Sequence, residues 1–261
     1  MSAAEKIDQA ASALLTLWQQ RTRCDGLSPD YRPSSRAEGY AVQQSIGEKQ
    51  QYALFGWKIA ATSIEGQRHI AVNGPLAGRL FTDRVLRDGA SVTLDNNLMR
   101  VAEIEFAFRF AHTLPPLSRL YGVDEVLEAV ACIHPSIEVP DSRYNDFVQA
   151  GEAQLIADNA CANVFVLGPR ADDWQDFDYV NQAVGVRLNG EIVESGFGRN
   201  VLGDPRIALT WLVNELSALG VACEAGQVVT TGTCRIPVTV KPGDVVAADF
   251  GVLGKVSCRF T

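Results

Sequence analysis

Residues 101–109, Val101-Ala-Glu-Ile-Glu-Phe-Ala-Phe-Arg109, show the alternation that is typical of a β-strand. Side chains in a strand point alternately to its two faces, so the even-numbered apolar residues predict a core face. Glu103 and Glu105 lie on the other face, roughly 6.5–7 Å apart along the backbone. From this separation both carboxylates can bind one cation. The alternative is a solvated outer face of an antiparallel sheet.

A third acidic residue, Glu138, stands between two apolar residues in Pro135-Ser-Ile-Glu-Val-Pro140. A carboxylate is expensive to bury alone, so this position requires a partner. Three carboxylates, Glu103, Glu105 and Glu138, would suit octahedral Mg²⁺ or Mn²⁺, whereas zinc prefers nitrogen and sulfur ligands. A salt bridge from Glu138 to Arg143 or Arg100 is the alternative.

Two further residues are candidates for proton transfer. Lys58 is a lone cation in the apolar segment 55–60, and burial near a metal would lower its pKa and fit it for this role. A lysine that reaches solvent from a strand edge is the alternative. Asp83 could act as a second acid or base, or it could be a turn residue.

Two other segments offer groups that could contact a substrate. Glu65 and His69 have the i, i+4 spacing of a helix and could form a general-base dyad on a mobile segment, or an exposed pair. The segment 230–233, Thr-Thr-Gly-Thr, offers hydroxyls and backbone amides for a substrate carboxylate, with Thr233 as the candidate binding residue. A tight turn would explain this segment equally well.

The composition limits the class of protein. The 261 residues, 47% of them hydrophobic, suffice for one large domain with a substantial core. The net charge of −8 comes from scattered acidic residues. The sequence has no cluster of basic residues of the kind that binds nucleic acid or an anionic membrane, so neither partner is expected. The first residues lack a secretory pattern, and no apolar stretch is long enough to span a bilayer. We therefore expect a cytoplasmic protein.

The six cysteines form no Cys-x-x-Cys pair, which predicts free, mostly buried thiols rather than disulfides or a zinc site. The three histidines are far apart in the sequence and offer little for a nucleophilic triad or a His-rich metal site. The segment 185–203 is rich in glycine but has no dinucleotide-binding or P-loop spacing. A hard-metal site must therefore be built from carboxylates.

The order of local patterns indicates an α+β protein. Residues 1–55 form a predicted N-terminal helical region, whose second helix covers about residues 36–53. Residues 56–261 form a sheet-rich body of short β-type runs. Within it, the segment from Val123 predicts a helix that leads into a strand, and Asp204-Pro205 predicts a helix start with an end at Gly220. We expect a mixed, strongly bent β-sheet.

Several short motifs together resemble the fumarylacetoacetate hydrolase superfamily, and specifically its 2-keto-4-pentenoate hydratase / 4-oxalocrotonate decarboxylase branch. In chain order these motifs are Gly56-Trp-Lys58, Gly78-Arg-Leu-Phe-Thr-Asp83, Ala102-Glu-Ile-Glu105, Ile137-Glu-Val139, Ala157-Asp-Asn159, Trp211-Leu212 and Thr231-Gly-Thr233. The resemblance implies a bent mixed β-sheet roll, fumarylacetoacetase-like, preceded by a small N-terminal helical region.

The resemblance also implies site residues. According to this resemblance, Glu103, Glu105 and Glu138 are ligands of Mg²⁺ or Mn²⁺, and Lys58 is a proton shuttle. It implies a small-molecule 2-oxo acid substrate and a homo-oligomer that could associate with a related pathway enzyme. One departure matters: Leu76 stands where many hydratases of this branch carry an acid.

The first functional hypothesis is a divalent-metal-dependent hydratase, a lyase that adds water to a 2-hydroxydienoate or 2-oxo-enoate such as 2-hydroxypenta-2,4-dienoate in aromatic catabolism. A 4-oxalocrotonate-type decarboxylase is the first alternative. Hydrolysis of a carbon–carbon bond in an acylpyruvate and a non-catalytic partner subunit are the others.

Overall fold

The structure is a computed structural model that describes all 261 residues. Its helices are α1 (Ala3–Gln20), α2 (Arg36–Lys49), α3 (Ile64–His69), α4 (Val123–Glu128), α5 (Glu152–Ala157) and α6 (Pro205–Ala218). Its short 3₁₀ turns are η1 (Thr82–Arg84), η2 (Asn159–Cys161), η3 (Gly198–Asn200) and η4 (Gly251–Leu253). Its strands are β1 (Leu54–Ala60), β2 (Leu76–Phe81), β3 (Val85–Arg87), β4 (Ser91–Val92), β5 (Val101–Phe110), β6 (Val130–Val139), β7 (Val164–Leu167), β8 (Ala183–Leu188), β9 (Glu191–Phe197), β10 (Val228–Thr233), β11 (Val238–Thr239), β12 (Val245–Asp249) and β13 (Lys255–Phe260).

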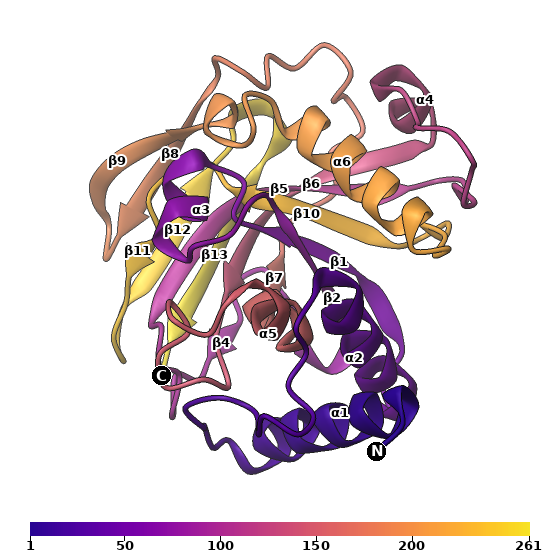
Figure 1. Cartoon of the computed structure of the whole chain (residues 1–261). Coiled ribbons are helices and arrows are strands. Elements are labelled where there is room, and N and C mark those ends of the chain that lie inside the picture. The colour runs from indigo at the N-terminus through magenta and orange to yellow at the C-terminus, as the bar shows by residue number, and fades with distance from the viewer.

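The larger of two sheets has the strand order β2-β1-β10-β5-β6-β7-β3, and β11 also pairs with β5. β1 pairs with β10 in parallel, and β3 pairs with β7 in parallel, while the central pairs β10–β5 and β5–β6 are antiparallel. The sheet curls strongly around the middle of the molecule (Figure 1). The predicted α+β fold with a bent mixed sheet is therefore confirmed.

The smaller sheet has the order β4-β13-β12-β8-β9, and its strand β13 packs against β6 and β7 of the larger sheet. One hydrophobic core runs through the whole chain, from Ala10 in α1 to Phe260 in β13. Phe106 on β5 illustrates how the sheets meet, since its ring lies edge-on to Phe250 at 5.0 Å. The even-numbered side chains of β5 thus form the core face that the alternation predicts.

The first 49 residues hold α1 and α2, which pack on each other, and α2 also packs on α5 (Figure 1). Ser2 and Glu5 form a capping box at the start of α1, and Ser35 caps α2. The predicted end of α2 near residue 53 is wrong, because Gln50 is already extended (φ −72°, ψ 140°) and leads the chain into β1.

Other local predictions are confirmed. Asp204 accepts a hydrogen bond from the Arg206 amide with Pro205 at the first helical position, and α6 ends just before Gly220, which has a positive φ of 73°. All six cysteines are free thiols, and only Cys24 is not fully buried.

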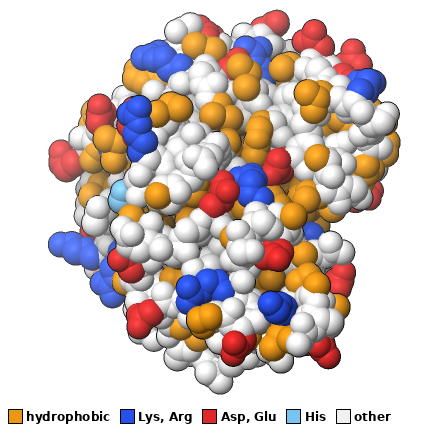
Figure 2. All heavy atoms as spheres, in the orientation of Figure 1, with side chains coloured by type: hydrophobic (Ala, Val, Ile, Leu, Met, Phe, Trp, Pro, Cys, Tyr) orange, Lys and Arg blue, Asp and Glu red, His pale blue; other side chains and the backbone are white.

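No helix has the length and apolar character that crossing a membrane requires. On the face in Figure 2, acidic and basic side chains are interspersed, and neither sign forms a continuous patch.

The parallel pairing of β1 with β10 depends on Gly56. A Cβ at this position would lie 1.9 Å from the Val228 carbonyl oxygen. We expect Gly56→Ala to lower the free energy of unfolding by about 1–3 kcal/mol, because the two strands would have to separate. Urea denaturation measures the free energy of unfolding of the variant. Gly74→Ala is the matched control, since no atom lies within 4 Å of its added Cβ; equal stability of the two variants would contradict the prediction.

Candidate metal and substrate site

Three glutamates on two adjacent strands form one acidic cluster. Glu103 on β5 stands directly opposite Glu138 on β6, and Glu105 follows two residues later on the same face of β5. Each offers a carboxylate oxygen, and these oxygens all lie within 4.8 Å of one another. Glu105 and Glu138 are both 0% exposed, so the alternative of a solvated outer face is wrong.

The alternative partners of Glu138 are also excluded by the structure. Arg143 forms a buried ion pair with Asp158, and Arg100 bonds to the backbone of Asn97. Glu138 instead lies beside Lys58, with 3.4 Å between its Oε2 and the lysine Nζ.

The carboxylate of Glu105 is held in place from β10. Its Oε2 accepts hydrogen bonds from the Thr230 hydroxyl and from the Gly232 amide, the latter at 3.0 Å. Gly232 has a φ of +92°, and a Cβ there would lie 2.1 Å from the Thr62 hydroxyl oxygen, so only glycine fits. The segment 230–233 therefore orients a glutamate of the cluster, a role that its sequence alone did not suggest.

The remaining oxygens of the cluster point to a bound cation. Glu105 Oε1 and both carboxylate oxygens of Glu138 are buried without a hydrogen-bond partner. Burial, together with the charge of Glu103, raises the pKa of Glu105 to about 8, and burial also raises the pKa of Glu138. Uncompensated buried carboxylates are costly. A divalent cation would satisfy these oxygens, and an all-oxygen donor set fits Mg²⁺.

Lys58 provides the positive charge of the site. β1 lies between β2 and β10, so Lys58 is only 2% exposed and does not reach solvent from an edge, as the alternative supposed. Burial alone lowers its pKa, but attraction by Glu138, Glu103 and Glu105 outweighs burial and raises the pKa overall. The protein groups by themselves therefore raise the pKa of Lys58, whereas the predicted lowering of this pKa applies to Lys58 beside a bound metal.

An unusual turn positions Lys58. Its Nζ donates a 3.0 Å hydrogen bond to the Ala160 carbonyl oxygen, and the three residues of η2 all have left-handed φ angles of 50–60°. The Asn159 side chain holds this turn by bonding both the amide and the carbonyl of Arg79 on β2. Left-handed residues other than glycine are strained, and no sequence signal predicts three in a row.

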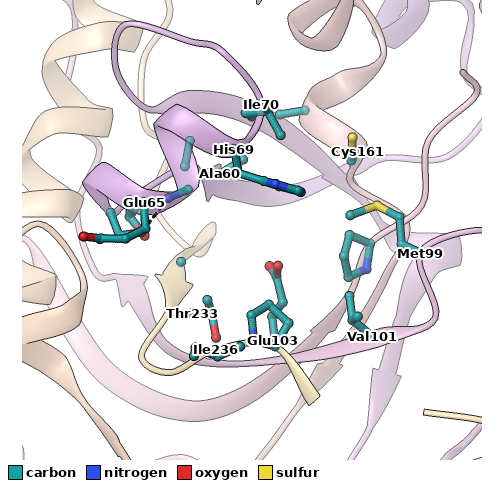
Figure 3. Close-up of a pocket in the computed structure, with 18 of the residues that line it drawn as sticks. Ala60, Glu65, His69, Ile70, Met99, Val101, Glu103, Cys161, Thr233 and Ile236 are labelled. Carbon is teal, nitrogen blue, oxygen red and sulfur yellow. Dashed lines mark hydrogen bonds between the residues drawn. The ribbon is translucent and has the colours of Figure 1, made fainter. Parts of the chain in front are cut away.

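The acidic cluster opens into a cavity of about 1040 Å³, large enough for a small-molecule ligand. In Figure 3 the Glu103 carboxylate points up into this cavity, and the His69 ring lies on the opposite side. Met99, Val101 and Ile236 add apolar surface to the wall. The site thus combines a charged floor with partly apolar walls.

The structure brings some predicted residues to the cavity and not others. Thr233 and Leu76 line it. Asp83 does not line it: this residue is in η1, where it pairs with Arg84, so its predicted role as a catalytic acid or base is not supported by its position. Glu65 and His69 both line the cavity on α3, but they point in different directions and no hydrogen bond joins them.

Comparison with known proteins agrees with this geometry. Residues 79–261 match the family described as fumarylacetoacetate (FAA) hydrolase C-terminal. The chain belongs to this family. A 2-oxo-hept-4-ene-1,7-dioate hydratase of Escherichia coli is 30% identical over 98% of this chain and 96% of its own. A 2-keto-4-pentenoate hydratase of Dechloromonas aromatica is 33% identical over 79% of this chain and 78% of its own.

A solved structure resembles the whole chain. It is a 4-oxalocrotonate decarboxylase from Pseudomonas putida G7 complexed with magnesium and adipate, with a TM-score of 0.90, 27% identity and coverage of 100% of this chain and 99% of that chain. A second structure of that decarboxylase, complexed with calcium and acetate, has a TM-score of 0.88.

The cluster predicts a stability change on metal binding. We expect Mg²⁺ to raise the melting temperature of the protein, because binding to the folded state alone stabilises it. In Glu105→Gln this increase should be largely lost, with a fall in Mg²⁺ affinity of at least about tenfold. Thermal unfolding with Mg²⁺ and with a chelator measures both the change in melting temperature and the Mg²⁺ affinity. Glu65→Gln, in the same cavity but outside the cluster, should keep the full increase; an unchanged Mg²⁺ response in Glu105→Gln would remove the proposed metal site.

Proposed function

We propose that this chain is a divalent-metal-dependent hydratase, a lyase that adds water to a 2-hydroxydienoate or 2-oxo-enoate such as 2-hydroxypenta-2,4-dienoate, formed in the breakdown of aromatic compounds. The observation that supports it is the cluster of Glu103, Glu105 and Glu138, which lies beside Lys58 and is open to one cavity. The hydratase names of several relatives add support.

The residues that would hold Mg²⁺ or Mn²⁺ are the three glutamates, which offer only oxygen donors. A bound divalent cation supplies Lewis-acid stabilisation of the negative charge that develops on the C2 oxygen of a 2-oxo acid. Lys58 would move the proton during ketonisation of the dienol through its Nζ, which is buried and fixed by the Ala160 carbonyl. Lys58, Glu105 and Glu138 are almost completely buried, which strengthens these electrostatic interactions.

Decarboxylation of an oxalocrotonate-like diacid is the second candidate, and one observation favours it. Leu76, which is fully buried, stands in the cavity wall at the position where many hydratases carry an acid. Asp83, which the sequence offers as a candidate acid or base, is outside the cavity. Loss of CO₂ requires no base to activate water, so an apolar wall is compatible with it. Both reactions would share the proton transfer at Lys58.

The other two hypotheses have less support. A carbon–carbon hydrolase would need a dyad of Glu65 and His69, which are not hydrogen-bonded to each other. A non-catalytic partner subunit would not need Lys58 buried against the acidic cluster. Assembly into a homo-oligomer, and association with a related pathway enzyme, remain predictions that analytical ultracentrifugation of the protein alone and in mixtures would test.

Product analysis separates the two leading reactions. With Mg²⁺, we expect the absorbance of 2-hydroxypenta-2,4-dienoate to fall without CO₂ release, with 4-hydroxy-2-oxopentanoate as the product. If oxalocrotonate loses CO₂ and the pentadienoate is not consumed, the chain is a decarboxylase. Inertness towards both substrates while Mg²⁺ still binds would contradict the proposed enzymatic function.

Lys58→Ala tests the proton-transfer role. We expect turnover to fall by about 10²–10⁴-fold, which is the usual contribution of a general acid or base. Mg²⁺ binding should persist, because removing a positive charge beside the carboxylates does not weaken their attraction for a cation. Steady-state kinetics and calorimetric Mg²⁺ titration measure the two effects. Lys49→Ala, which removes a partly exposed lysine paired with Asp8, is the control; normal turnover in Lys58→Ala would exclude the role.

A further inference from the structure

A second cavity lies on the other side of the larger sheet from the acidic cluster. Where β1 meets β2, Lys58 pairs with Gly78 and Trp57 pairs with Arg79. Neighbouring side chains of a strand point to opposite faces, so Trp57 and Arg79 lie on the face opposite Lys58. The cavity on that face has a volume of about 140 Å³, and it shares no lining residue with the larger cavity at the acidic cluster.

Arg79 is the one basic side chain that lines this second cavity. Its backbone amide and carbonyl are both bonded to Asn159, but no hydrogen bond or ion pair engages its guanidinium. The Nε is buried, whereas the two terminal nitrogens stay accessible. The guanidinium lies over the Trp57 ring, 4.6 Å from the centroid, and this contact fixes its position. The second cavity thus presents a fixed cation that has no partner.

The charge of Arg79 is not balanced by the protein. Burial lowers the pKa of Arg79 to about 10, and attraction by Glu48 offsets only part of this effect. Glu48 is exposed on α2, where it accepts a hydrogen bond from Gln44. A largely buried cation without a counter-ion costs free energy, which an anion in the cavity would recover.

The walls of the second cavity limit which anion fits. Most of its lining residues are apolar, and they include Ala41 on α2 and Leu216 on α6. The single positive charge of Arg79 balances a monoanion, whereas the second charge of a phosphate dianion would be buried without compensation. The volume suffices for about four or five non-hydrogen atoms, since a water molecule takes about 30 Å³ in the liquid. A short-chain carboxylate has this size, one charge and one apolar end.

We propose that Arg79 and the cavity around it form a binding site for a short-chain carboxylate, separate from the site of the proposed reaction. The two terminal nitrogens of the guanidinium donate parallel hydrogen bonds to the two carboxylate oxygens. The apolar end of the ligand contacts Ala41 and Leu216. The inference does not depend on the proposed function, because no residue of this site belongs to the acidic cluster or to the larger cavity.

Propionate is the probe, and propionamide, which has nearly the same shape without the charge, is its matched control. The ¹⁵N–¹H signal of the Arg79 Nε reports binding at this site; it is recorded on the full chain in Mg²⁺ and assigned by its loss in Arg79→Gln. We expect propionate to shift this signal saturably and propionamide to leave it unchanged. Ala41→Leu keeps the guanidinium but fills part of the cavity, so it should weaken propionate binding by about tenfold or more.

Thermal unfolding gives a second readout. Propionate should raise the melting temperature of the unmodified chain, because a ligand that binds the folded state stabilises it. In Arg79→Gln this increase should be lost. Arg199→Gln is the matched control, since it removes an exposed arginine that also lies over an aromatic ring, that of Phe197, and it should keep the increase.

Other outcomes separate this site from the acidic cluster and from an interface. Glu105→Gln alters the cluster on the other face of the sheet and should keep the shift of the Arg79 signal. No shift with propionate, or an equal shift with propionamide, would overturn the proposal. A change of oligomeric state in Arg79→Gln, measured by analytical ultracentrifugation, with no propionate binding to the unmodified chain, would also overturn it, because a second copy of the chain would then cover the cavity.

Discussion

The structure depends on the burial of two carboxylates and one ammonium group in the middle of a sheet, beside a third carboxylate that is half-buried. Glu105, Glu138 and Lys58 are almost completely buried, and the single positive charge cannot balance three negative ones. Backbone geometry adds to the compensation: the Gly232 amide donates to Glu105, and the left-handed turn at η2 presents the Ala160 carbonyl to Lys58. A divalent cation would complete the charge balance, so the same arrangement that is costly for folding is suited to binding metal.

The order of strands explains how residues distant in the sequence meet. β1, β10, β5 and β6 are consecutive neighbours in the larger sheet, and they supply Lys58, Thr230, the pair Glu103 and Glu105, and Glu138. Neighbouring strands lie about 4.8 Å apart, so side chains on the same face come within contact distance. The bend of the sheet then turns this face into the wall of a cavity. A flat sheet with the same residues would present them to solvent.

Much of the fold and the metal cluster could be predicted, because both depend on local patterns. The alternation in 101–109 placed Glu103 and Glu105 on one face, and Asp204-Pro205 marked the start of α6. The features that the sequence did not predict depend on distant neighbours. The raised pKa of Lys58 results from carboxylates on β5 and β6, and the position of Asp83 outside the cavity results from the path of η1. The cavity beside Arg79 is lined by residues of α2, α6 and β1, which meet only in the folded chain.

The sequence by itself determined which residues could serve as metal ligands, since three acids in apolar strand contexts need a common partner. It also determined the strand β5 and the start of α6, since strand alternation and a helix cap are local patterns. The tertiary structure alone decided what surrounds each charge. It placed Lys58 in an inner strand, assigned Thr230 and Gly232 to Glu105 and left the Arg79 guanidinium without a partner in the wall of a second cavity. The physical reason is that burial and pairing of a charge depend on through-space neighbours from strands far apart in the chain, which no local pattern encodes.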